Sequence, residues 1–153
     1  MNIGQIFSGL SSTAAVGQAI RSLIRNTRGT RRALLLELQK NINLIYLYTK
    51  DGAPIEKVAA KLELRHYERA NQSGFDFNAL KKRTVRTELV KDKPPLRPYA
   101  GWTTEQLFER IYLKIHNLKS IVAIDPKNER FRLHVRLLNI LRLMLLLLQH
   151  LKT

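Results

Sequence analysis

Apolar side chains recur every three or four positions along most of this chain, a spacing that places them on one face of an α-helix. In residues 31–49, for example, Leu34, Leu38, Ile42 and Ile45 follow this step. The helices predicted from the pattern span residues 1–28, 31–49, 54–62, 103–123 and 126–151, and residues 65–71 are expected to add another turn or two. The fold class expected from them is all-α, a small helical bundle of four to five helices.

Local signals place two of the helix boundaries. Thr103 with Gln106 three residues later forms a capping-box pattern, which predicts a helix start. Asp125 followed by Pro126 combines a favoured N-cap residue with a favoured first helical residue, so the last helix is expected to begin there. Both signals depend on side chains that satisfy the free amides of a first helical turn.

Two segments depart from the regular helical pattern. Residues 81–98 are expected to form a basic, proline-containing connector, whose end is extended because it contains Pro94, Pro95 and Pro98. The N-terminal amphipathic helix within residues 1–28 contains glycines that lower its helix propensity. It is therefore interpreted as a conditional helix that forms on a partner surface.

The last predicted helix ends in a run of six apolar residues, Leu143 to Leu148. A helix that is apolar on all sides must be surrounded. In a short chain with few helices, this run suggests self-association or a dedicated partner. Length and a hydrophobic content of 44% favour one folded unit, so residues 1–153 are expected to form a single domain.

The net charge of the chain indicates which class of partner it binds. The chain has 27 Lys and Arg against 12 Asp and Glu, a net charge of +15, and its first acidic residue is Glu37. Such an imbalance favours binding to a polyanion: nucleic acid, an anionic membrane or an acidic protein. There is no cysteine, and the four histidines lack metal-ligand spacing, so no metal, cofactor or small-molecule substrate is expected.

The basic residues fall into three groups. In the first, Arg21, Arg25, Arg28 and Arg32 are spaced so that they would line one face of a continuous helix and could follow a row of phosphates. A solvent-exposed charged face is the alternative interpretation. The second group, Lys81, Lys82, Arg83 and Arg86, lies in the predicted connector. The third group is Arg130, Arg132 and Arg136, of which the last two are one turn apart on the last predicted helix. The residues predicted to bind nucleic acid are Arg21, Arg25, Arg28, Arg31, Arg32, Lys81, Lys82, Arg83, Arg86, Arg132 and Arg136.

The favoured function is that of a non-catalytic basic helical protein that binds nucleic acid, preferably RNA, as an oligomer or as an accessory subunit of a larger complex. In architecture it would be similar to the small basic four-helix accessory proteins of retroelement reverse transcriptases. A cytoplasmic location is expected. The acid-free segment 1–36 leaves a mitochondrial targeting segment as an alternative.

Two other binding functions are also consistent with the sequence. The N-terminal amphipathic helix could lie in a membrane interface with Ile3, Phe7 and Leu10 inward, which would suit a membrane-associated effector. The basic surface could also dock an acidic protein. Burial of the apolar stripe within the folded chain would argue against the membrane interpretation.

One enzymatic alternative rests on Arg110 and His116, which are separated by five residues. This pair resembles the Arg-x(4–6)-His element of HEPN ribonucleases, which are all-helical and usually dimeric. The resemblance implies RNA cleavage by that Arg and His. The chain departs from the family at Ile111, where a polar residue is usual, and on a regular helix the pair would point about 120° apart.

Overall fold

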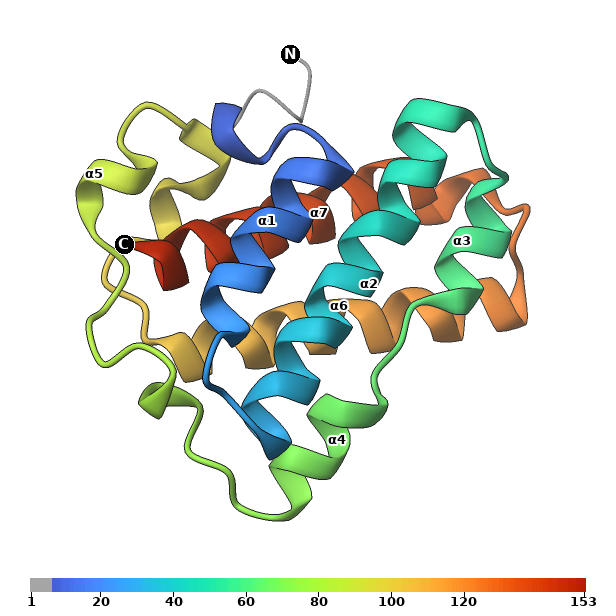
Figure 1. The fold of residues 1–153 in the computed structure, drawn as a ribbon. Helices are drawn as coiled ribbons and strands as arrows, with labels where there is room; N and C mark the ends of the chain where they lie inside the picture. Colours follow the sequence, from blue (N-terminus) through green and yellow to red (C-terminus); the bar gives the residue numbers. More distant parts are fainter. Residues whose placement is uncertain (1–6) are drawn as a thin grey trace.

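Seven α-helices and four one- or two-turn 3₁₀ helices make up residues 7–153, the part of the chain that the computed structural model describes (Figure 1). This part contains no strand, so the all-α class is confirmed, with seven helices where four to five were expected. The α-helices are α1 (Thr13–Ile24), α2 (Gly29–Asp51), α3 (Ile55–Lys61), α4 (Arg65–Gln72), α5 (Thr87–Val90), α6 (Thr104–Ile124) and α7 (Leu133–Lys152). The 3₁₀ helices are η2 (Ser8–Leu10), η3 (Phe77–Ala79), η4 (Pro94–Tyr99) and η5 (Glu129–Phe131).

Helix α7 lies at the centre of the molecule. It contacts α1, α2, α3, α5, α6 and η4, and Figure 1 shows the α1–α2 hairpin in front of it. Every residue of the run Leu143 to Leu148 is at most 2% exposed. The chain itself therefore covers the apolar run, and the run supplies no argument for self-association.

The N-terminal helix is shorter than the sequence pattern predicts. Residues 1–6, including Ile3, lie outside the described residues, and α1 begins only at Thr13. The side-chain oxygen of Ser12 accepts a hydrogen bond from the amide of Ala15 at 3.1 Å, so Ser12 caps a new helix after η2. The apolar side chains of α1 face the core, with Val16 and Ile20 fully buried.

The connection between α6 and α7 differs from the prediction. The capping box of Thr103 and Gln106 is confirmed at the start of α6. Asp125, however, is the C-cap of α6, and α7 begins only at Leu133. The side chain of Asn128 accepts from the amide of Arg130 and starts η5, which replaces the first turns of the predicted 126–151 helix.

The basic connector, residues 81–98, is folded rather than extended. It contains α5 and η4, and η4 includes all three prolines. A proline fixes φ near the value of a 3₁₀ helix, and Pro94 and Pro95 occupy its first two positions, which need no amide donor, whereas Pro98 lies inside it. Val85 then exchanges two backbone hydrogen bonds of 2.8 Å with Gly101 and Trp102, which hold the segment against the start of α6.

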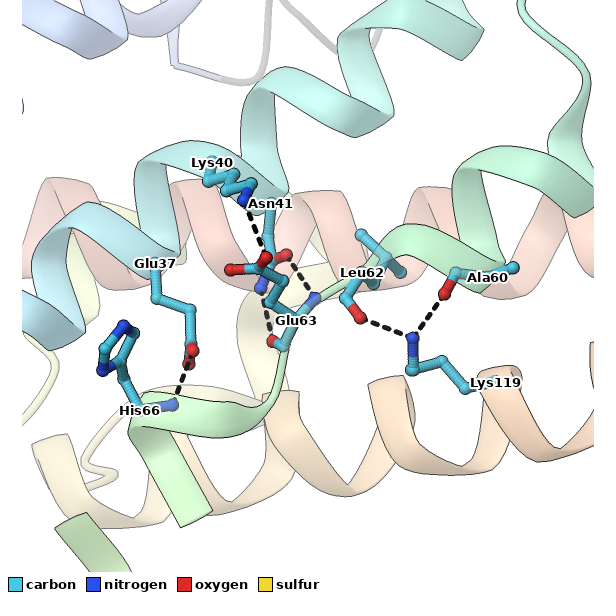
Figure 2. A network of polar contacts seen from close by, with 8 residues as sticks. All are labelled: Glu37, Lys40, Asn41, Ala60, Leu62, Glu63, His66 and Lys119. Carbon is cyan, nitrogen blue, oxygen red and sulfur yellow. Dashed lines mark hydrogen bonds and ion pairs between the residues drawn. The ribbon is translucent and has the colours of Figure 1, made fainter. Parts of the chain in front are cut away.

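A polar clamp on α2 holds the linker between α3 and α4 (Figure 2). Asn41, fully buried, donates from Nδ2 to the carbonyl of Glu63 at 2.9 Å and accepts at Oδ1 from the Glu63 amide at 2.8 Å. The buried carboxylate of Glu37 accepts from the amides of His66 at 2.7 Å and Tyr67 at 3.2 Å. These contacts satisfy backbone groups of the linker and of the first turn of α4, where a carboxylate is favourable.

Only one ion pair is found within residues 7–153, that of Lys40 with Glu63 at 2.7 Å. Lys119 of α6 instead donates to the carbonyls of Ala60 and Leu62 at 2.5 and 2.6 Å, at the end of α3 (Figure 2). Its positive charge lies where the helix dipole is negative. Most basic side chains of the described residues therefore have no acidic partner in the folded chain.

A buried histidine links α7 to the start of α6. The Nε2 of His150 lies 2.9 Å from the hydroxyl of Thr104, which donates to the carbonyl of Lys81 at 2.7 Å. Because that hydroxyl proton is already used, Nε2–H of a neutral His150 is the donor in this pair. Burial, followed by the charge of Lys81, lowers the pKa of His150 from 6.5 to about 4.

This lowered pKa predicts a loss of stability in mild acid. Between pH 6.5 and 4 the unfolded chain binds a proton at His150 that the folded chain does not, so the free energy of unfolding falls as the pH falls. The loss is at most about 3 kcal/mol. Urea unfolding at pH 7 and pH 4.5 should show a larger decrease for the wild type than for His150→Gln, which keeps a donor. Equal decreases would contradict the assignment.

Candidate polyanion-binding site

A hollow of about 320 Å³ lies between the second half of α6 and the start of α7. Its charged side chains come from α6, from η5 and from the start of α7. Its lining residues are Lys114, Asn117, Arg130, Phe131, Arg132, Val135, Arg136, Asn139 and Ile140. We call these residues the α6–α7 hollow.

The α6–α7 hollow contains four cationic side chains and no carboxylate. Burial, and then the neighbouring charges of Arg110 and Arg136, lowers the pKa of Lys114. Burial is the larger cause, and the two arginines add a repulsion that no carboxylate lining the hollow offsets. A bound anion would relieve that repulsion.

Two polar side chains of the α6–α7 hollow are held in fixed orientations. The Nε of Arg136 donates to the carbonyl of Phe131 at 2.7 Å. The Nη1 of Arg142 donates to Oδ1 of Asn139 at 2.8 Å, so the Asn139 amide group presents its NH₂ as the remaining donor. Side chains that are already oriented lose less conformational entropy when they bind a ligand.

The start of α7 forms one edge of the hollow. Arg132, its N-cap residue, has φ 51°, a left-handed conformation that is unfavourable for a residue with a side chain. No side chain caps the first amides of α7, and its first turn contains no acidic residue. His134 in that turn contacts the hydroxyl of Tyr48 at 2.5 Å, which attaches the start of α7 to α2.

Of the predicted nucleic-acid-binding residues, the structure brings Arg132 and Arg136 together in the hollow. They do not form the one-turn pair on a single helix that the prediction assumed, because Arg132 lies before the first turn of α7. Arg130 and Lys114 join them from η5 and α6.

The arginine ridge of residues 21–32 does not lie on one continuous helix. Asn26 and Gly29 adopt positive φ values of 64° and 62°, which end α1 and turn the chain into α2. Arg21 therefore lies on α1, and Arg32 lies on the first turns of α2. All five arginines of this group, Arg21, Arg25, Arg28, Arg31 and Arg32, are exposed at the α1–α2 turn. Figure 1 shows this turn at the opposite side of the molecule from the start of α7.

The four predicted nucleic-acid-binding residues of the connector differ in exposure. The Lys81 side chain is half-buried and its carbonyl accepts from Thr104, whereas Lys82, Arg83 and Arg86 are exposed. None of the four lines the α6–α7 hollow.

A second hollow of about 390 Å³ lies between α2 and α4, beside the polar clamp. Its cations include Arg32 and Arg65, but Glu37 and Glu63 also line it. Two carboxylates would repel an anionic ligand, so this hollow is less suited to phosphate than the α6–α7 hollow.

The HEPN-like pair lies on one helix, α6, with both side chains exposed. His116 lies six positions after Arg110, with five residues between them, which places the two side chains about 120° apart around that helix. The guanidinium of Arg110 lies over the ring of Trp102 at 5.3 Å. This contact orients Arg110 toward the N-terminal end of α6, away from His116.

Lys114 and Asn117 are the site residues that sequence reasoning missed. A signal was present, because Arg110 and Lys114 are like charges one turn apart with no carboxylate between them on that face. The packing of α6 against α7 brings Lys114 beside Arg136, and this packing could not be predicted from the sequence.

No family model, no curated protein and no solved structure matches this chain. Across residues 7–153, no helix reaches the length and apolarity that crossing a membrane requires. In the same part of the chain, no three His, Cys, Asp or Glu side chains lie together so that they could hold a metal ion.

Proposed function

We propose that this protein is a non-catalytic, cytoplasmic nucleic-acid-binding protein, with RNA as the favoured ligand, that works as an oligomer or as an accessory subunit. The observation that carries the proposal is the α6–α7 hollow, where four cations surround a space of about 320 Å³ that no carboxylate lines. Phosphate oxygens are the ligand groups that match such a set of Arg and Lys donors.

The rest of the surface supports the same ligand class. The chain has a net charge of +15, and residues 7–153 contain a single ion pair. The exposed arginines at the α1–α2 turn supply a second cationic surface. A long polyanion can contact both surfaces, whereas a small anion can contact only one.

The membrane alternative receives less support. The apolar side chains of residues 7–24 that would enter a bilayer are packed inside the protein, with Leu10, Val16 and Ile20 at 0% exposed. Insertion would require the hairpin of α1 and α2 to open. The residues of that stripe before Phe7 lie outside the described part of the chain.

The proposal is tested by measuring the affinity for fluorescent single-stranded RNA, single-stranded DNA and duplex DNA at several salt concentrations. We expect binding whose log affinity falls linearly with log salt, and a slope near −0.7 per phosphate contacted for single strands. Tighter binding to RNA than to DNA is the expected order. Absence of binding to all three at low salt would overturn the proposal, and binding to anionic vesicles in that case would favour the membrane alternative.

A further inference from the structure

We propose that the α6–α7 hollow receives a terminal phosphate of the nucleic acid, a phosphomonoester at a 5′ or 3′ end, rather than an internal phosphodiester. This inference rests on the proposed function and makes its ligand more specific. It is carried by the charge, size and fixed donors of the hollow.

The charge of the hollow matches a dianion. A phosphomonoester carries between −1.5 and −2 at neutral pH, as phosphorylated side chains do, whereas each internal phosphate carries −1. Four cations gather here, and Lys114 is already repelled by Arg110 and Arg136. A terminal phosphate would neutralise about twice as much of this charge as one internal phosphate.

The donors of the hollow are arranged for several oxygens at once. Arg136 uses Nε on the carbonyl of Phe131, which leaves its two terminal NH₂ groups on a guanidinium that is held in place. Asn139 presents its amide NH₂ because Arg142 occupies its oxygen. A terminal phosphate offers three free oxygens to such donors, and an internal phosphate offers two.

The size of the hollow favours the end of a chain over a continuous strand. About 320 Å³ is at the lower end of the range for small-molecule pockets, roughly 300–1,000 Å³. The buried side chain of Ile140 and the half-buried ring of Phe131 line it together with the cations. Phe131 provides an aromatic surface on which the terminal base could stack.

The backbone at Arg132 gives an independent observation. A left-handed conformation at a residue with a long side chain costs free energy, and such conformations cluster at functional sites. Here it places a cation at the edge of the hollow and leaves the first amides of α7 without a side-chain cap. Those amides are additional donors for an anion at that edge.

The test compares three single-stranded RNAs of one sequence: one with a 5′-phosphate, one with a 3′-phosphate and one with hydroxyls at both ends. We expect one phosphorylated RNA to bind at least about 10-fold more tightly than the hydroxyl form, and its identity names the end that is recognised. Equal affinity for all three overturns this inference and leaves the proposed function standing. Failure of all three to bind overturns both this inference and the choice of RNA as the ligand in the proposed function.

Arg132→Gly locates the preference within the protein. Glycine accepts the left-handed conformation, so the variant removes a cation without adding strain, and its melting temperature should not be lower than that of the wild type. We expect it to lose most of the preference for the phosphorylated end. Arg69→Gln, which removes an exposed cation of α4 outside the hollow, should keep the preference. An unchanged preference in Arg132→Gly would overturn the assignment to this hollow.

Discussion

Reversing the charges of Arg132 and Arg136 with Arg132→Glu and Arg136→Glu is expected to weaken RNA binding at least about 100-fold at moderate salt. Each arginine is expected to make a charge-assisted contact with phosphate, and such hydrogen bonds are worth about 1.5–3 kcal/mol each. Both side chains are exposed, so the fold should tolerate the change. The salt dependence should also become shallower, because fewer counterions are released.

The matched control reverses two exposed lysines outside the α6–α7 hollow, with Lys57→Glu and Lys91→Glu. It changes the net charge by the same amount. We expect it to weaken binding only a few-fold, through the general field of the protein. If the two double variants lose equal affinity, binding depends on net charge alone and the hollow is not the site.

Replacing Asn41 by alanine is expected to lower the free energy of unfolding by about 2–4 kcal/mol. The change removes both hydrogen bonds between the buried Asn41 side chain and the backbone of Glu63. It leaves an amide and a carbonyl of the α3–α4 linker without their partners, and unsatisfied buried groups cost about 1–3 kcal/mol each. Denaturant unfolding followed by circular dichroism measures the loss.

Asn43→Ala provides the control for this prediction. Asn43 lies on the same helix, and its buried Oδ1 makes no hydrogen bond within the described residues. Its replacement should therefore change stability by less than about 0.5 kcal/mol or increase it slightly. Similar losses for the two variants would show that the polar clamp contributes little.

The long helices of the bundle could be predicted from sequence because their signals are local. The apolar step of residues 31–49 and the capping box of Thr103 and Gln106 need no tertiary information. The start of α7 could not be predicted in the same way. Asp125 and Pro126 are residue types that often begin a helix, but in this chain Asn128 caps the 3₁₀ helix η5 just after them.

The candidate site could be predicted only in part, for a related reason. Arg132 and Arg136 were visible as neighbouring cations, but Lys114 belongs to another helix, and its contribution depends on the packing of α6 on α7. The prediction that the arginines of residues 21–32 share one face was wrong, because a periodic spacing places residues on one face only if they belong to one helix. Positive φ angles at Asn26 and Gly29 end that helix, and spacing alone does not reveal them.

The central position of α7 also sets the order in which this protein can fold during synthesis. Helices α1, α2, α3 and α6 all leave the ribosome before α7, and each of them contacts it in the folded structure. The parts of their apolar faces that pack on α7 therefore stay open to water, and to other nascent chains, until the segment Leu143 to Leu148 emerges. Exposed apolar surface on a growing chain is what chaperones bind, so production in cells should depend on chaperone supply more than the stability of the finished protein would suggest.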